Sequence, residues 1–199
     1  MLGLAEDNAR LLLRLMKHFD AKDLGKISHF FEVCPKWRCP CCYRSKEEFA
    51  RLDKNKNLLC QIVQHHDHFS EVLWDRVSWK DLGEMNLKSA VDASLVRFPE
   101  TMICGDCNVA DPAAKSLVKA ASSFSFAPFE IASFVVVKSN APHGLDAEKV
   151  RTAYEAAKQS MTVISGRIKT IIRNSGSENT FENVGDASNR VIELLRAKF

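Results

Sequence analysis

Apolar residues recur every three or four positions over two long stretches of the chain, which predicts two amphipathic helices. The first stretch covers residues 5–19 and the second covers residues 146–173. A shorter pattern of the same kind predicts a final helix over residues 186–198. After the first helix, residues 20–36 predict a helix and a turn.

The middle of the chain has a different pattern. Residues 58–64 are rich in residues that favour strands, and residues 101–103 predict a second, short strand. Between them, residues 69–100 have helical spacing and predict one or two short helices inserted between the two strands. Asp111 and Pro112 predict the start of the helix that follows, because proline is tolerated in a first turn.

These elements predict an α+β fold that is mostly helical. We divide it into an N-terminal helical segment (1–36), a core (37–121) and a C-terminal helical extension (122–199). Residues 122–142 are strongly apolar and predict a buried helix or strand plus a loop, and the pattern leaves both open.

Composition adds limits to this picture. A chain of 199 residues with 46% hydrophobic content can bury a core, and no apolar run is long enough to span a membrane. We find no signal peptide, since charged residues interrupt the N-terminal leucines. The seven cysteines are therefore expected to be reduced, in a cytoplasmic protein.

Four of the cysteines form two Cys-x-x-Cys pairs. Cys39 and Cys42 lie in the run WRCPCCYR, and Cys104 and Cys107 lie in ICGDCN. Two such pairs supply four thiolates to one tetrahedral zinc ion, so we expect a structural zinc site that holds together two segments about 60 residues apart. The remaining cysteines are interpreted as ordinary thiols: Cys34, Cys41 and Cys60.

A histidine cluster and a basic stretch lie near these pairs. The cluster Gln64-His65-His66-Asp67-His68 follows the predicted strand. Basic residues crowd around the first cysteine pair, which is typical either of a solvated loop or of a phosphate-binding surface. Next to a zinc site and histidines we favour the second, with these candidate DNA contacts: Arg44, Lys46, Arg51 and Lys54.

Taken in order, these motifs resemble the HNH (ββα-metal) endonucleases. The order is CPxC, then Asp-His after a strand, then CxxCN, and it covers residues 39–119. The chain is most similar to zinc-containing members such as phage Holliday-junction-resolving nucleases and small HNH restriction enzymes. The resemblance implies a small ββα-metal core stapled by the four-cysteine zinc site. It also implies cleavage of phosphodiester bonds in DNA, with magnesium or manganese as the catalytic metal.

The resemblance also implies roles for individual residues. His68 would be the general base, while Asp67 and Asn108 would hold the catalytic metal. His65 would lie beside these ligands or contact the phosphate, and His66 would be the more replaceable neighbour. Chemistry agrees, because histidine accepts protons near neutral pH and hard cations prefer oxygen ligands.

Two details of the motif carry further expectations. Successive residues of a strand point to opposite faces, so Asp67 and His68 cannot both face one pocket from a regular strand. We therefore expect the strand to end or bend at Asp67. Asp111 is either a third metal ligand or an acidic residue that favours the helix N-terminus. The middle Asn of the family motif has no counterpart in residues 97–100.

A different class of function fits the same residues. A non-catalytic zinc-knuckle DNA-binding protein would also need the four cysteines and the basic stretch, and its histidines would complete a second structural metal site. An HNH endonuclease that cuts both strands often acts as two copies, so a homodimer is a further expectation. Neither interpretation involves a membrane.

Overall fold

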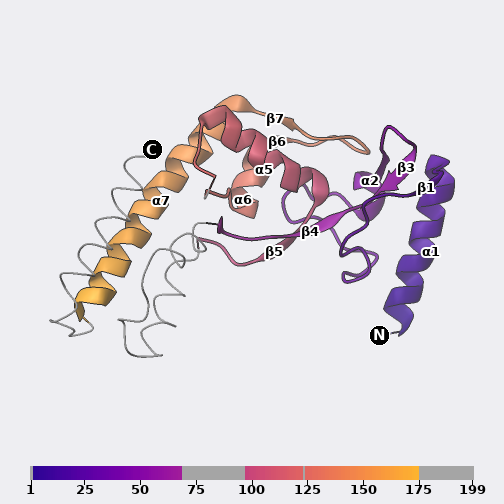
Figure 1. Cartoon of the computed structure of the whole chain (residues 1–199), viewed down its shortest axis with the longest axis horizontal. Coiled ribbons are helices and arrows are strands. Elements are labelled where there is room, and N and C mark those ends of the chain that lie inside the picture. Colours follow the sequence, from indigo (N-terminus) through magenta and orange to yellow (C-terminus); the bar gives the residue numbers. More distant parts are fainter. Residues whose placement is uncertain (1, 69–96, 123, 175–199) are drawn as a thin grey trace.

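The computed structural model describes residues 2–68, 97–122 and 124–174, and within these ranges the fold is mixed α+β, as predicted (Figure 1). Helices are combined with three small sheets. The predicted helices within residues 69–100 and 186–198 lie outside the described residues, apart from a few positions at the edges.

Helix α1, Leu2–Phe19, confirms the first predicted helix and lies at one end of the molecule (Figure 1). Three leucines on one face are buried: Leu11, Leu12 and Leu15. The helix expected within residues 20–36 is wrong, because that segment forms turns and strand β1, Asp23–Leu24. This strand pairs so closely with its neighbour that a Cβ added at Gly25 would lie 2.8 Å from Leu59 Cδ2.

The first sheet has the order β1-β3-β2. Strand β3, Asn57–Leu59, pairs in parallel with β1 and antiparallel with β2, Arg51–Leu52. The short helix α2, Lys46–Phe49, precedes β2 and begins with a capping box between Ser45 and Glu48. This sheet lies between α1 and the rest of the molecule (Figure 1).

Strand β4, Ile62–His65, pairs antiparallel with β5, Thr101–Cys104, and helix α5, Gly105–Val118, follows β5 directly. The single strand predicted over residues 58–64 is therefore two strands, divided at Cys60 and Gln61. The backbone amide of Cys60 bonds to the Lys26 carbonyl there, and the Gln61 carbonyl accepts from Gly105.

Helix α5 starts earlier than predicted, and Pro112 lies inside it rather than in its first turn. The first turn is set instead by Cys104 and Gly105, where β5 ends. Proline has no N–H, so Pro112 cannot donate the usual helical bond to the carbonyl of Asn108.

The C-terminal part of the described chain contains α6, Pro128–Phe134, the two-stranded sheet β6–β7 and the long helix α7, Ala147–Asn174. The strands are Val135–Val136 and Gly144–Leu145. The sequence left a helix or a strand open for residues 122–142. The structure has a short helix there, followed by a strand and a loop. Helix α7 confirms the second predicted amphipathic helix.

Buried residues from α1 through α7 belong to one hydrophobic cluster. Its aromatic part is a group of rings in edge-to-face contact around Phe126, with Phe124, Phe134 and Tyr154. Among the described helices, none combines the length and apolar character that crossing a membrane requires.

Candidate metal centre

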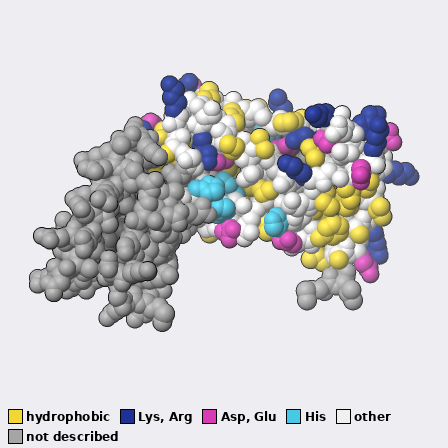
Figure 2. Space-filling view, in the orientation of Figure 1, with side chains coloured by type: hydrophobic (Ala, Val, Ile, Leu, Met, Phe, Trp, Pro, Cys, Tyr) yellow, Lys and Arg dark blue, Asp and Glu magenta, His cyan; other side chains and the backbone are white. Residues whose placement is uncertain are grey.

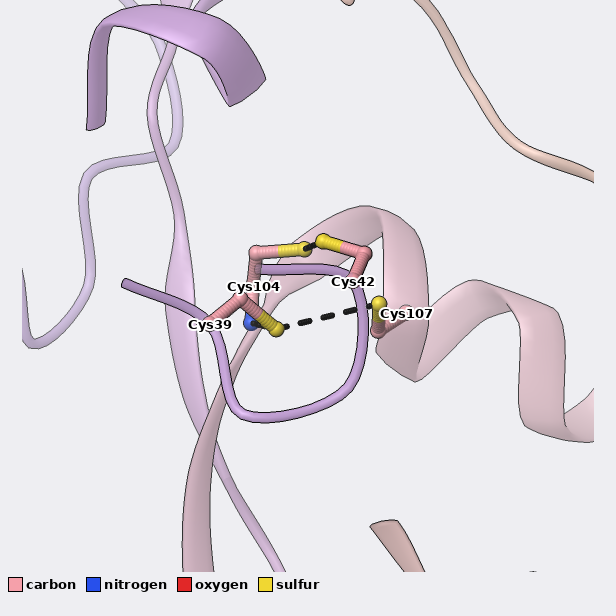
Figure 3. Close-up of side chains that lie close together, drawn as sticks. All are labelled: Cys39, Cys42, Cys104 and Cys107. Atoms are coloured by element: carbon pink, nitrogen blue, oxygen red, sulfur yellow. Dashed lines mark hydrogen bonds between the residues drawn. The ribbon is translucent and has the colours of Figure 1, made fainter. Parts of the chain in front are cut away.

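The four predicted cysteines lie together and are buried (Figure 3). Cys39 and Cys42 come from a tight turn, which is closed by a bond from the Tyr43 amide to the Cys39 carbonyl. Cys104 is the last residue of β5, and Cys107 lies in the first turn of α5. The site therefore joins the turn to the point where strand becomes helix.

The distances among the sulfur atoms fit a tetrahedral metal. Zn–S bonds of about 2.3 Å require sulfur atoms about 3.8 Å apart in a tetrahedron. Cys39 Sγ lies 3.8 Å from Cys107 Sγ, and Cys42 Sγ lies 3.7 Å from Cys104 Sγ. All four atoms lie within 4.8 Å of one another. These four cysteines are the ones predicted from the sequence. Among the described residues, they form a site that suits a structural metal such as zinc.

The protonation of the thiols supports the same conclusion. Hydrogen bonds from Cys104 and Cys107 lower the pKa of Cys42 to about 5. The pKa of Cys107 is raised instead, by its hydrogen bonds to Cys104 and Cys39. Four adjacent thiols thus ionise only in part by themselves, whereas a divalent cation stabilises all four thiolates together.

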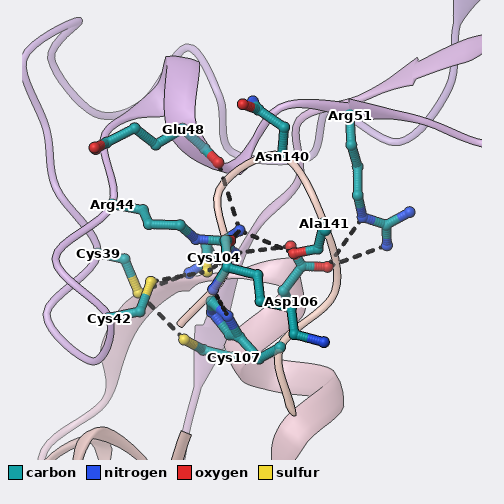
Figure 4. Close-up of polar contacts among 12 residues, drawn as sticks. Cys39, Cys42, Arg44, Glu48, Arg51, Cys104, Asp106, Cys107, Asn140 and Ala141 are labelled. Atoms are coloured by element: carbon teal, nitrogen blue, oxygen red, sulfur yellow. Dashed lines mark hydrogen bonds and ion pairs between the residues drawn. The ribbon is translucent and has the colours of Figure 1, made fainter. Parts of the chain in front are cut away.

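Arg44 is the main polar partner of this site (Figure 4). Its guanidinium donates to Cys104 Sγ at 3.6 Å and pairs with Asp106 at 2.8 Å. It also donates to the carbonyls of Lys138 and Ala141, at 2.7 and 3.1 Å. A zinc ion with four thiolates has a net charge of about −2, which a buried guanidinium partly balances.

The burial of two basic residues corrects the predicted DNA contacts. The side chain of Arg44 is 3% exposed, and both of its terminal nitrogens are engaged at the cysteine site. Lys46 is buried as well, and its Nζ donates to Asn8 Oδ1 and to the carbonyls of Phe30 and Val33. Neither can reach a DNA phosphate, because both charges are turned inward.

The other two predicted contacts are at the surface. Arg51 is partly exposed and pairs with Asp106 at 3.1 Å, while Lys54 is exposed. The remaining cysteines differ in environment: Cys41 and Cys60 are buried and Cys34 is exposed. None of these three belongs to the four-cysteine set.

His65 is a packing residue in this structure. It ends β4, is 4% exposed and stacks on Phe98 with ring centroids 5.3 Å apart. Its Nε2 lies 2.7 Å from the carbonyl oxygen of Phe126. One ring nitrogen of His65, the residue that the resemblance places beside the metal ligands or against the phosphate, is thus engaged with the backbone.

Strand β4 ends at His65, before Asp67, as the alternation of side chains predicted. Asp67 is 3% exposed, and its Oδ2 accepts a hydrogen bond of 3.0 Å from the Arg97 amide. His66 and His68 are partly exposed and in contact, with ring centroids 4.5 Å apart. Figure 2 shows histidine side chains gathered at the surface over this part of the molecule.

Asn108 lies in the first turns of α5, directly after Cys107, and is partly exposed. Asp111 lies one turn further along and has structural partners. Its Oδ1 accepts from the Phe126 amide at 2.7 Å, and its Oδ2 pairs with Lys115 at 2.9 Å. Because α5 begins at Gly105, Asp111 is not at the helix N-terminus, and the interpretation as an N-terminal acid is wrong.

Three residues that sequence reasoning missed support the histidine cluster: Arg97, Ser125 and Glu130. Arg97 bonds to Asp67, Ser125 Oγ accepts from the His68 amide at 3.4 Å, and Glu130 pairs with Arg97 at 2.6 Å. They come from distant segments with no motif of their own. The sequence therefore held no signal that could have found them.

Comparisons with protein-family models, with curated proteins and with solved structures find no match to this chain. Its function therefore has to be argued from the residues of the site and their geometry.

Proposed function

We propose that the protein is a metal-dependent HNH endonuclease that hydrolyses phosphodiester bonds in DNA. Zinc would occupy the four-cysteine site as a structural ion. Asp67 and Asn108 would hold magnesium or manganese, and His68 would activate water.

One structural observation supports this proposal above all others. The Phe126 amide bonds to Asp111 of α5, and the Phe126 carbonyl bonds to His65 at the end of β4. The second turn of α5 is therefore level with the end of the strand. Asn108 lies one turn before Asp111, and Asp67 and His68 follow His65, so Phe126 links the two segments that carry the candidate residues.

The donors fit a hard divalent cation. A carboxylate oxygen that accepts one hydrogen bond keeps a second lone pair, so the bond from Arg97 does not prevent Asp67 from ligating a metal. Asn108 offers its side-chain oxygen, and its backbone carbonyl receives no helical bond from Pro112. When bound, the cation would neutralise charge on the phosphate and on the leaving oxygen.

The chain's own residues would carry the remaining steps. An imidazole nitrogen of His68 would accept the proton of the attacking water, for which a partly exposed histidine is suited. By resemblance the products would carry a 5′-phosphate and a 3′-hydroxyl. The structural zinc would hold β5 and α5 against the Cys39–Cys42 turn, and so fix Asn108 without taking part in the chemistry.

The partner would be DNA, with contacts from surface residues such as Arg51 and Lys54. A second copy of the chain would allow both strands of a duplex to be cut.

The test is cleavage of supercoiled plasmid, linear duplex and a four-way junction in magnesium or manganese. We expect His68→Ala to lower the cleavage rate about 100-fold or more, because a positioned general base contributes that much. His66→Ala is the matched control, since its ring touches that of His68. We expect it to cleave near the wild-type rate.

Zinc content and DNA binding are measured on the same variants. If His68→Ala cleaves like wild type while folding and DNA binding are unchanged, the endonuclease proposal is wrong. A protein that binds DNA without cleaving any of these substrates would point to the non-catalytic zinc-knuckle protein instead.

A further inference from the structure

Arg97 and Glu130 form a buried ion pair next to Asp67. The Arg97 Nη2 to Glu130 Oε1 distance is 2.6 Å, and the two side chains are 3% and 7% exposed. Burying an ion pair carries a large desolvation cost, which is offset only when the remaining donors and acceptors are also satisfied. The surroundings of this pair meet most of that requirement.

Several contacts fix the Arg97 side chain. Its Nη1 donates to the Ser125 carbonyl at 2.6 Å, and its guanidinium carbon lies 5.0 Å from the centre of the Phe124 ring. The other carboxylate oxygen of Glu130 accepts from the Ala127 amide at 2.7 Å, where α6 begins. The pair therefore joins the backbone at residue 97 to the start of α6.

The same two segments hold the histidine cluster. Anchoring the Arg97 side chain limits the movement of its backbone, and the Arg97 backbone N–H donates to Asp67 Oδ2. Ser125 accepts from the backbone of His68 and also provides the carbonyl that Arg97 binds. Phe98, the next residue, stacks on His65. The network therefore contacts His65, Asp67 and His68.

We propose that Arg97 and Glu130 are positioning residues that orient the Asp67 carboxylate for metal binding. This inference rests on the proposed function, because it assigns a purpose to a ligand of the catalytic cation. Arg97 acts through its own amide, and Glu130 acts through Arg97.

A purely structural role for the pair predicts a different result from a positioning role. Replacing one partner leaves an unpaired buried charge and destabilises the fold, which would obscure the effect on the metal. Replacing both by apolar residues of similar size removes both charges and commonly preserves stability. The informative variant is therefore the double substitution Arg97→Met and Glu130→Met. Glu130→Gln is a milder second variant, because the Gln side-chain oxygen still accepts a hydrogen bond in place of the carboxylate.

The experiment measures Mn²⁺ binding to the zinc-loaded protein by the electron paramagnetic resonance signal of free Mn²⁺. We expect both variants to keep their zinc and a cooperative thermal transition, and to bind Mn²⁺ more weakly. Loss of residues that orient a ligand typically weakens metal binding 10- to 100-fold. We expect that range for the double variant and a smaller change for Glu130→Gln.

Two further variants frame the result. Asp67→Asn gives the affinity without the carboxylate, and Arg38→Met removes an exposed ion pair with Glu48. We expect Arg38→Met to bind Mn²⁺ like wild type. Folded double and Glu130→Gln variants that do so as well would show that the pair only supports the fold.

The outcome separates this inference from the proposed function. Cleavage that survives in His68→Ala overturns the proposed mechanism, yet leaves the positioning role in place if Mn²⁺ binding still depends on Arg97 and Glu130. A wild-type protein that binds no Mn²⁺ overturns the positioning role whatever its activity, because there would be no metal for Asp67 to hold.

Discussion

Strands β4 and β5 pair antiparallel, and we call this pair the β4–β5 hairpin. Its two ends are constructed in different ways. At the Cys104 end, four chemically equivalent donors converge from two short motifs, and each motif sets the spacing of its own pair. At the His65 end, neighbouring side chains have separate partners: His65 binds the Phe126 carbonyl and Asp67 binds the Arg97 amide. The cysteine site is therefore determined by two short sequence motifs. The histidine end depends instead on residues such as Phe126 and Arg97, which only the tertiary fold brings near it.

The largest expected effect is at the cysteine end. Cys104→Ser removes one of four ligands, and structural zinc typically contributes about 10 kcal/mol or more to folding in small domains, comparable with the whole stability of a protein. We expect loss of bound zinc and of the cooperative thermal transition, measured by metal analysis and circular dichroism. Cys34→Ser is the control, because that thiol is exposed and outside the set. A Cys104→Ser variant as stable as wild type would contradict a structural metal.

A second large effect is expected where α1 joins the segment before the cysteines. Lys46→Met removes the ammonium that satisfies Asn8 and the carbonyls of Phe30 and Val33. We expect the free energy of unfolding to fall by about 2 kcal/mol in urea titrations. Asn8 Oδ1 and the Phe30 carbonyl are left unpaired, at about 1 kcal/mol or more each, whereas the Val33 carbonyl keeps the bond from Asn8 Nδ2. Lys54→Met, at an exposed lysine, should leave it unchanged. Equal stability of the two variants would show that the buried lysine contributes nothing.

A smaller effect tests the histidine end. His65→Phe keeps the stacking on Phe98 but loses the bond to the Phe126 carbonyl. We expect a loss of about 1–3 kcal/mol, the cost of an unsatisfied buried acceptor, with zinc retained. His66→Phe should change the melting temperature little. If His65→Phe abolished Mn²⁺ binding without lowering stability, His65 would be part of the metal site after all.

The smallest effect is a dependence of stability on pH. Burial lowers the pKa of Lys46 to about 8, from an ordinary value of 10.5. Between these values the folded protein has released this proton while the unfolded chain still binds it, so the Lys46 contribution to stability rises with pH across that window. Urea unfolding with a reductant at pH 7.5 and 9.5 should show a larger difference between wild type and Lys46→Met at the higher pH. An unchanged or smaller difference would contradict the lowered pKa.

The contrast also explains what the sequence allowed us to predict. The amphipathic patterns of α1 and α7 and the cysteine spacing are local, and all three were confirmed. The start of α5 was placed too late because Pro112 is typical of a first turn, yet β5 passes directly into the helix at Gly105. The helix predicted within residues 20–36 was wrong because β1 pairs with β3, which is distant in sequence, and a local pattern does not show such a contact.

Long-range partners explain the other differences as well. Arg44 and Lys46 were interpreted as part of a phosphate-binding surface because their charge alone does not reveal that each has a buried acceptor. Asp106, which pairs with Arg44, follows it by about 60 residues and only the fold brings the two together. No local pattern reveals how Arg97 and Glu130 relate to Asp67, since that relation is created by tertiary structure.

The hairpin has one further consequence, for how the protein can be rebuilt. His65 pairs with Thr101, and Asp67 is bonded to Arg97, so the chain leaves the hairpin and returns to it at adjacent points. Loop-closure entropy grows only with the logarithm of length, and doubling an insertion costs about 0.6 kcal/mol. A change in the number of residues between 68 and 97 would therefore cost little closure entropy as long as these two contacts hold.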